Sequence, residues 1–141
     1  MTDSLQAAAK LIEGVLLRQP FMQMLGVTLG AVGEGEVELR LALRPDLTQH
    51  GGVIGALADN AAGAAAGTLT LPEKATVTAE YKINFIAPGA GDALRAVGRV
   101  LKPGRSLIAV ESRVYALRDG TETLVAAALA SMVPVPLPPR G

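Results

Sequence analysis

The sequence predicts an α+β fold in which one long central helix is covered by an antiparallel sheet. An apolar segment of helical length occupies residues 52–69, and four strand-like segments follow it. The turns between these strands are too short for parallel crossovers. Since nothing else in a chain of 141 residues can cover the helix, the sheet must wrap around it. The length indicates a single domain over residues 1–141.

The N-terminal elements are predicted to be a helix followed by a hairpin. Apolar residues recur at helical spacing from Ser4, a typical N-cap residue, to about Arg18, and Pro20 ends the pattern. Residues 1–20 are therefore expected to contain an N-terminal amphipathic helix. Between residues 24 and 44 the apolar period changes and glycines divide the segment into two strand-like runs, which predicts a β-hairpin.

The segment from Gly52 to Leu69 is apolar enough to raise the question of a membrane span, which needs about 20 such residues. Asp59 and Asn60 lie side by side at its centre, and its glycines would weaken an isolated helix. A buried helix of a globular fold, which ends before Pro72, is therefore the better interpretation.

Four strands are expected after this helix, at residues 76–87, 93–101, 106–117 and 122–133, which gives a sheet of five to six strands with the hairpin. In the first of them, the odd-numbered residues 77–85 are expected on one face and the even-numbered residues 78–84 on the other. Glu80 and Lys82 thus share a face and can pair with each other. The proline-rich residues 134–141 predict an extended tail.

Composition excludes several functional classes. The chain has 13 basic and 13 acidic residues and few aromatic ones, so we expect no general binding of nucleic acid. With no cysteine and one histidine, it cannot form a disulfide framework, a thiolate metal site or a multi-histidine metal cage. Residues 1–10 lack the basic start of a secretory signal, so we expect a cytoplasmic protein that is not attached to a membrane.

Asp59 requires an explanation, because an unpaired carboxylate in an apolar helix costs free energy. It shares a helix face with Gly55, Gly63 and several alanines, and such small residues suit close contact with a partner subunit. One interpretation is a structural carboxylate bonded to Asn60, a nearby hydroxyl or a backbone amide. The other is a general base or nucleophile poised by partial burial.

The start of the helix can bind a developing negative charge. At Gly51 and Gly52, unpaired backbone N–H groups and the positive end of the helix dipole point outward, and no side chain hinders a substrate carbonyl. His50 lies nine residues before Asp59, roughly 13 Å along the helix axis. One chain therefore cannot easily use both ends of this segment in one site, whereas two chains of a dimer can.

Residues 50–52 (HGG) followed by residues 57–63 (LADNAAG) resemble the signature of hotdog-fold acyl-CoA thioesterases of the PaaI-like, phenylacetate-degradation type. Residues 82–88 and 100–106 also resemble later segments of this family, so the resemblance covers most of the chain. It implies a hotdog fold, in which an antiparallel sheet wraps a central helix. It also implies a homodimer with sheets joined edge to edge, which often doubles to a homotetramer.

The resemblance further implies roles for four residues at a site between subunits. Gly51 would donate its backbone N–H to the thioester oxygen, and His50 would shape the loop that presents it. Asp59 of the other chain would act as general base or nucleophile. Thr78, ten residues before Pro88, would help to position the attacking water.

Six further residues are expected to contact the substrate. Three adjoin the catalytic residues, and three basic ones flank a turn that the resemblance places near the nucleotide of coenzyme A. They are Gln49, Gly52, Asn60, Arg99, Lys102 and Arg105. A guanidinium can pair with a phosphate there, although a solvated basic turn is the simpler interpretation. Arg44 departs from the family pattern, which commonly has Asn or Gln six residues before the histidine.

The predicted function is hydrolysis of the thioester of a small-to-medium acyl-CoA, with coenzyme A as part of the substrate and with no cofactor or metal. One alternative is a hotdog hydratase or dehydratase that acts on enoyl- or hydroxyacyl-thioesters. Its motif has four residues between Asp and His, whereas only three separate Asp46 from His50. The other alternative is a non-catalytic acyl-CoA binding module, which would bind acyl-CoA without turnover.

Overall fold

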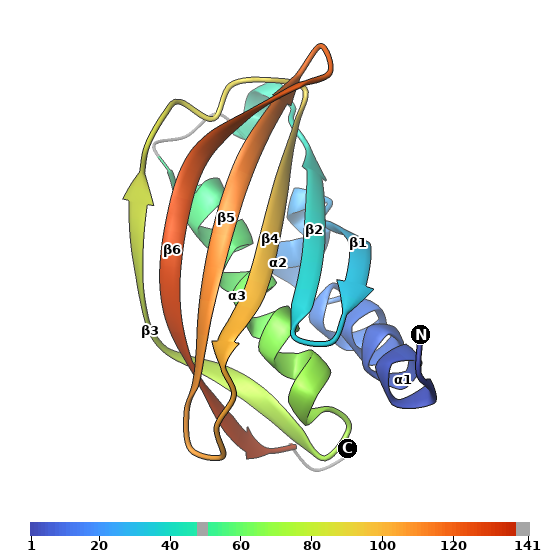
Figure 1. Cartoon of the computed structure of the whole chain (residues 1–141). Helices are drawn as coiled ribbons and strands as arrows, with labels where there is room; N and C mark the ends of the chain where they lie inside the picture. The colour runs from blue at the N-terminus through green and yellow to red at the C-terminus, as the bar shows by residue number, and fades with distance from the viewer. Residues whose placement is uncertain (48–50, 138–141) are drawn as a thin grey trace.

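The computed structural model describes residues 1–47 and 51–137, in which an antiparallel sheet wraps around one long helix (Figure 1). The six strands lie in the order β1-β2-β4-β5-β6-β3. Their bounds are Thr28–Gly33 (β1), Glu36–Ala42 (β2), Lys74–Phe85 (β3), Ala93–Lys102 (β4), Ile108–Arg118 (β5) and Thr121–Pro136 (β6). The long helix α3 spans Gly52–Thr70. The predicted α+β class and the wrapped central helix are therefore confirmed.

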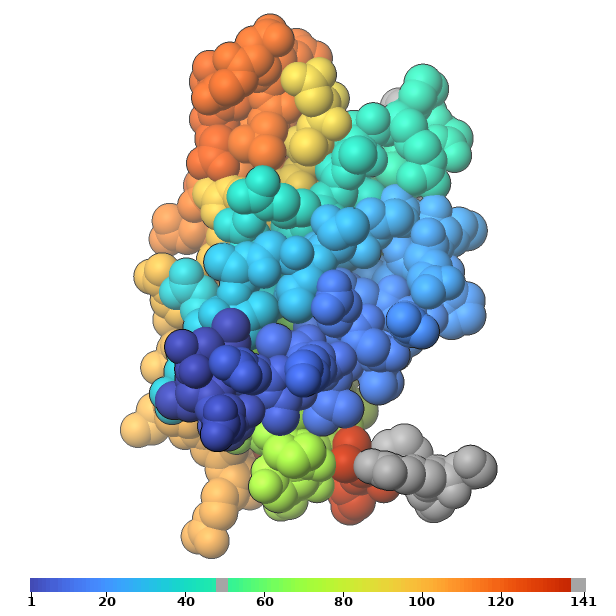
Figure 2. Space-filling model, turned by 90° about the vertical axis from the view of Figure 1, so that its right-hand side faces the viewer, coloured from blue at the N-terminus to red at the C-terminus, as the bar shows by residue number. Residues whose placement is uncertain are grey.

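The N-terminal segment differs from the single helix that was predicted. Helix α1 (Asp3–Leu11) continues into a π-helical turn at Ile12–Leu16, and a second helix, α2, spans Pro20–Leu25. The first helical segment ends before Pro20, as expected, but Pro20 also begins α2, which was not predicted; proline at the first position of a helix loses no hydrogen bond. In Figure 2 these helices, in blue, lie across one side of the molecule beside β1 and β2.

Helix α3 packs closely against the sheet. The face predicted for the core, which contains Ile54, Leu57 and Ala61, is buried. Gly98 of β4 permits the close contact, since a Cβ atom there would lie 2.1 Å from the carbonyl oxygen of Ala61. The buried hydroxyl of Ser112 donates a 2.7 Å hydrogen bond to the carbonyl of Ala58 and so joins β5 to the helix. Within the described ranges, no helix has the length and apolar character needed to cross a membrane.

Strand β6 continues further than the sequence predicts. The tail was expected from residue 134, but β6 extends to Pro136 and pairs with β3 up to Lys74. Two prolines are accepted in this strand because its pairing with β5 ends at Met132, which leaves one edge of β6 free beyond that residue. The remaining predicted tail, residues 138–141, lies outside the described residues.

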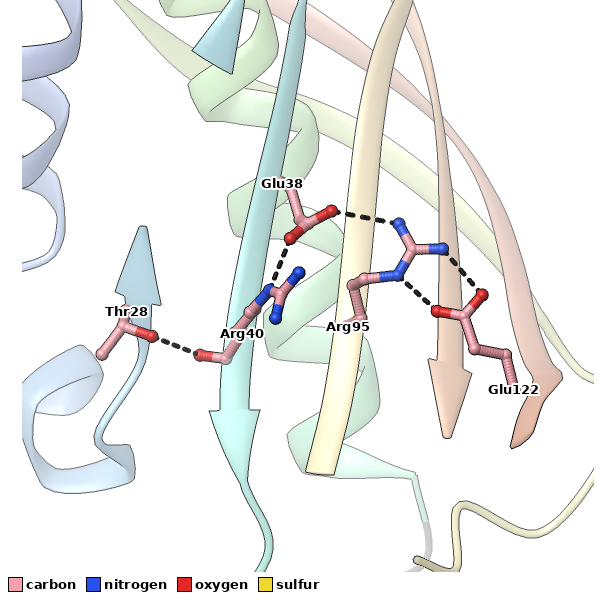
Figure 3. A network of polar contacts seen from close by, with 5 residues as sticks. All are labelled: Thr28, Glu38, Arg40, Arg95 and Glu122. Carbon is pink, nitrogen blue, oxygen red and sulfur yellow. Dashed lines mark hydrogen bonds and ion pairs between the residues drawn. The ribbon is translucent and has the colours of Figure 1, made fainter. Parts of the chain in front are cut away.

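Ion pairs cross the outer face of the sheet (Figure 3). Arg95 of β4 donates hydrogen bonds to Glu38 of β2, at 3.1 Å, and to Glu122 of β6, at 2.6 and 3.0 Å. Its guanidinium lies 4.7 Å from the centre of the Tyr115 ring, which it crosses to reach β6. The hydrogen bond from Arg95 lowers the pKa of Glu122. This network ties together strands that are not all neighbours in the sheet.

Candidate active site

Strand β3 runs antiparallel along helix α3 and contacts it at four successive helical turns. Thr76 donates a 3.2 Å hydrogen bond to the carbonyl of Gly63. The next three contacts join Thr78 to Asp59, Tyr81 to Gly55, and Phe85 to Gly51. These contacts show which residue of β3 lies beside each of these turns of α3.

A β-bulge determines which side chains of β3 face the helix. The register with β6 shifts between Thr78 and Glu80, so Ala79 is an extra residue. The expected strict alternation over residues 77–85 was therefore wrong. Thr78 faces α3 on one side of the bulge, and Tyr81 faces it on the other.

The bulge places Thr78 against the carboxylate of Asp59. The Thr78 hydroxyl donates a 2.7 Å hydrogen bond to Oδ1 of Asp59, and it also lies 3.4 Å from the sulfur of Met132. Asp59 is half-buried, whereas Thr78 is exposed. Among the described residues, Thr78 is the only hydrogen-bond partner of this carboxylate, which it contacts at Oδ1.

One structural interpretation of the Asp59 carboxylate required a hydrogen bond with Asn60. The two side chains do not form this bond. The side-chain amide of Asn60 instead donates a 2.9 Å hydrogen bond to the carbonyl of Ala56 within the same helix. The side chain is half-buried beside Asp59 on the open side of α3. The interpretation that agrees with the structure is a carboxylate held by one hydroxyl.

Gly51 begins the helix in a conformation that suits glycine. Its φ of +91° lies in the left-handed region, and a Cβ atom there would lie 2.7 Å from the Phe85 ring. Gly52, the first residue of α3, is exposed next to it. The first amides of a helix have no acceptor within it, so this terminus can donate hydrogen bonds to a substrate oxygen.

Gly51 and Asp59 of one chain do not lie together. They are eight positions apart along the helix, which corresponds to about 12 Å along the axis. Between Gly52 and Gly63, the incompletely buried residues of α3 form one stripe, which contains Gly52, Ala56, Asp59, Asn60 and Gly63. A Cβ atom on Gly63 would have no neighbour within 4 Å among the described residues. The helix therefore presents an open face beside the carboxylate.

An apolar groove of about 900 Å³ reaches the start of α3. Gly51 and Ile54 contribute to it from the helix, Leu43 from the end of β2, and Phe85 and Ile86 from the end of β3. Phe85 and Ile86 are each about half exposed, at 54% and 55%. The groove can accept an apolar group next to the amides at the helix terminus.

The basic residues expected at the substrate nucleotide lie at the other end of the same chain. Lys102 ends β4 and Arg105 lies in the β4–β5 turn, at the lower end of Figure 1, whereas α3 begins at the upper end. Arg99 donates a 2.9 Å hydrogen bond to Glu36, which raises the pKa of its guanidinium. The structure thus does not bring these three residues to Gly51 within one chain.

Two of the predicted site residues, His50 and Gln49, lie outside the described residues. Arg44, which departs from the family pattern, has a structural role instead. Its guanidinium donates hydrogen bonds to the carbonyls of Met24 and Leu25 at the end of α2, and it pairs with Asp46 at 2.8 Å. Arg44 therefore caps a helix that the sequence analysis did not predict.

Sequence reasoning missed the residues at the end of β3. Phe85 packs on Gly51 and Ile86 lines the groove, yet both were treated as ordinary strand residues. Tyr81 was missed as well, although its hydroxyl would lie 3.3 Å from a Cβ atom on Gly55. The alternation placed Tyr81 and Phe85 on one face of β3, but it gave no signal that this face meets Gly55 and Gly51, because these contacts join segments far apart in the sequence.

Comparison with known proteins agrees with this architecture. The model of the Thioesterase superfamily matches residues 48–123. The solved structure of a thioesterase family protein from Silicibacter pomeroyi has a TM-score of 0.87 and 34% identity, and the match covers 92% of this chain and 98% of that one. A protein of Saccharolobus solfataricus that carries the name esterase is 30% identical over 127 residues, which are 86% of this chain and 82% of that protein.

The PaaI protein from the phenylacetic acid degradation operon of Escherichia coli has the same fold, with a TM-score of 0.76, 21% identity and a match over 94% of this chain and 96% of that one. The fold and the match to the family model thus define a thioester hydrolase with a hotdog fold. This chain belongs to the Thioesterase superfamily.

Proposed function

We propose that the protein hydrolyses the thioester of a small-to-medium acyl-CoA to the free acid and coenzyme A, at a site shared by two subunits. The observation that carries this proposal is the 2.7 Å hydrogen bond between Thr78 and Asp59. It leaves one carboxylate oxygen available on the open face of α3, where a water molecule can be held and deprotonated.

In the proposed reaction, Gly51 and Asp59 have different roles. Backbone N–H groups at Gly51 bind the thioester oxygen and stabilise the negative charge that develops there. Asp59 of the partner subunit accepts a proton from water while the water oxygen bonds to the thioester carbon. Collapse of the tetrahedral intermediate then breaks the carbon–sulfur bond, and the proton is returned to the leaving thiolate.

Two subunits are proposed because helix geometry requires them. Gly51 and Asp59 of one chain are about 12 Å apart along the axis, which is too far for one carbonyl group to contact both. The open stripe on α3 and the free edge of β3, which lies at the end of the sheet, favour contact with a second copy. A homo-oligomer therefore completes the site.

The apolar groove beside Gly51 is the proposed place of the acyl group. It is formed by side chains such as Leu43, Ile54 and Ile86, and it adjoins the amides that would bind the thioester oxygen. An aliphatic acyl chain gains free energy when it leaves water for such a surface. The one guanidinium among its described lining residues, that of Arg44, is already bonded to Asp46 and to two carbonyls.

The test is thiol release from a series of acyl-CoA substrates by wild-type protein and by Asp59→Ala. Loss of the base should lower kcat by at least about 10²-fold, within the range typical of acid–base catalysis. Glu73→Gln, which changes an exposed carboxylate in the turn after α3, is the matched control and should retain full activity. Equal rates for wild type and Asp59→Ala would exclude the proposed base.

Two further assays separate the alternatives. Consumption of an enoyl-CoA without thiol release would indicate a hydratase. Tight acyl-CoA binding by the wild type with no turnover would indicate a binding module.

A further inference from the structure

We propose that Phe85 is a positioning residue, whose ring holds the backbone of Gly51 in the conformation that presents its N–H to the substrate oxygen. The role rests on the proposed function, because the Gly51 amide matters to the reaction only if it binds the thioester oxygen. Phe85 itself would contact none of the reacting atoms and would act on the reaction through Gly51.

The backbone of Gly51 needs a restraint from outside the residue. Glycine has no side chain, and it adopts positive and negative φ about equally well. The carbonyl of Gly51 accepts a 2.8 Å hydrogen bond from the N–H of Gly55, which fixes the peptide group on the helix side. The N–H of Gly51 belongs to the preceding peptide group and turns with φ. Its direction therefore depends on what keeps φ near +91°.

The Phe85 ring provides a contact of this kind. An ideal Cβ atom on Gly51 would lie 2.7 Å from Cε1, 2.8 Å from Cζ and 3.3 Å from Cδ1 of the ring. Among the described residues, the three atoms nearest to that position thus all belong to Phe85. The ring edge fills the space on one side of the Gly51 Cα atom, so the backbone cannot shift toward β3 without displacing the ring.

Phe85 is held in turn by its own backbone. It is the last residue of β3 and pairs with Ala126 of β6. The next two N–H groups, those of Ile86 and Ala87, both donate to the carbonyl of Val125, at 2.8 and 3.3 Å. The hydrogen bonds to β6 therefore fix the point from which the ring reaches Gly51, and the ring itself turns about only two side-chain torsions.

The exposure of Phe85 argues against a role in the core. The side chain is 54% exposed, so it gives up much of the free energy that full burial would provide. Phe85 also lines the apolar groove, and a wall for the acyl group is therefore the alternative role. The two roles predict different kinetics, because a wall affects long acyl groups and a restraint on Gly51 affects every substrate.

Leucine at position 85 separates these roles. The contact with Gly51 is closest at Cε1 and Cζ, at the far end of the ring, whereas a leucine side chain ends at its Cδ atoms. Phe85→Leu therefore keeps an apolar wall and loses the contact. Phe85→Tyr keeps every ring atom and is the conservative variant.

Steady-state kinetics on acetyl-CoA and on an eight-carbon acyl-CoA test the proposal. Phe85→Leu should lower kcat by about tenfold on both substrates, because a misplaced amide loses part of the roughly 10²–10³-fold effect of one oxyanion donor. KM for acetyl-CoA should change by less than about twofold, since the contact acts mainly in the transition state. Phe85→Tyr should retain most of the activity. Phe21→Leu changes the other, 50% exposed phenylalanine and is the matched control.

The NMR order parameter of the Gly51 amide is a second measurement, which does not depend on activity. It should be about 0.85 in wild type and in Phe85→Tyr, and it should fall to about 0.6 or below in Phe85→Leu. The amide of the buried Leu57, within α3, should keep its wild-type value in all variants and so show that the helix remains folded.

Unchanged kcat in Phe85→Leu, with a higher KM only for the eight-carbon substrate, would make Phe85 a groove wall and overturn the positioning role. An order parameter at Gly51 that is the same in wild type and Phe85→Leu would also overturn it. If thiol release still required Asp59 in either case, the proposed hydrolysis would stand without Phe85. Loss of order at Gly51 in a protein that releases no thiol would support the restraint and exclude the hydrolysis.

Discussion

Thr78 donates its hydroxyl hydrogen bond to Asp59 from a strand that begins after the helix ends, 19 residues further along the chain. The contact exists because the bulge at Ala79 turns Thr78 toward α3, while Tyr81 beyond the bulge faces the same helix. A strand of unbroken alternation would direct only one of these two residues to α3. Because of the bulge, one strand supplies both the hydrogen-bond donor for the carboxylate of Asp59 and the side chains that pack on the start of α3.

Thr78→Val should lower kcat and leave KM nearly unchanged, because valine keeps the shape of threonine but cannot hold the carboxylate. A hydrogen bond to a charged group contributes about 1.5–3 kcal/mol, which corresponds to roughly 10- to 100-fold in rate. Thr78→Ser restores the hydroxyl and should retain most of the activity. Steady-state kinetics on one acyl-CoA would measure this difference, and unchanged kcat in Thr78→Val would contradict the proposed role.

Mixing two inactive variants should restore activity if the site is shared between subunits. In a mixed dimer of Asp59→Ala with Gly51→Ala, one site contains the intact Gly51 of one chain and the intact Asp59 of the other. Random exchange of subunits gives mixed dimers for half of the population, so activity should return to about a quarter of the wild-type value. Thiol release after refolding the two variants together measures this recovery.

The matched control for this experiment mixes Asp59→Ala with Thr78→Val. Both residues belong to the same half of the proposed site, so no mixed dimer contains an intact one. Recovery in this control, or none in the first mixture, would mean that the site is not divided in the proposed way.

Ile86→Asp should weaken the binding of longer acyl groups. Ile86 lines the groove beside Gly51 and is 55% exposed, so folding should tolerate the change while a charge enters an apolar surface. We expect KM for an eight-carbon acyl-CoA to rise by about tenfold, from the loss of about 1.4 kcal/mol of apolar contact, with a smaller change for acetyl-CoA. Val15→Asp, at a 63% exposed valine outside the groove, is the control. Equal effects on both substrates would place the acyl group elsewhere.

The sequence alone was sufficient to predict the structural features that depend on local residue patterns. The helix predicted over residues 52–69 is α3, with Pro72 just beyond its end, and each predicted strand is present within a few residues of its expected bounds. The apolar core face with Leu57 and Ala61 was also correct, because helical periodicity alone specifies it.

The features that depend on contacts far apart in the sequence could not be predicted. The bulge at Ala79 is visible only once β3 is paired with β6. Pro20 was interpreted as a helix end although it begins α2, since the same residue serves both purposes. Arg44 caps α2, a helix that was not predicted. The sequence therefore showed Arg44 only as a departure from the family pattern.

The ion pair on the outer face predicts how stability changes with pH. The hydrogen bond from Arg95 lowers the pKa of Glu122, so folding favours the charged carboxylate. The stabilisation is complete above the unfolded pKa of about 4.3 and is lost as the pH falls through the lower pKa of the folded protein. Because Glu122 is exposed and solvent screens its pair with Arg95, we expect less than about 1 kcal/mol, or a Tm difference of at most about 4 °C between wild type and Glu122→Gln at pH 7.

Thermal unfolding between pH 7 and pH 3 would measure this loss. The Tm advantage of wild type over Glu122→Gln should stay constant down to about pH 5 and then decrease, because protonation removes the acceptor charge that Arg95 contacts. Glu13→Gln changes an exposed carboxylate that makes no ion pair among the described residues, so its Tm should follow that of wild type at every pH. A Tm difference for Glu122→Gln that persists unchanged at pH 3 would show that the pair does not act through the charge of Glu122.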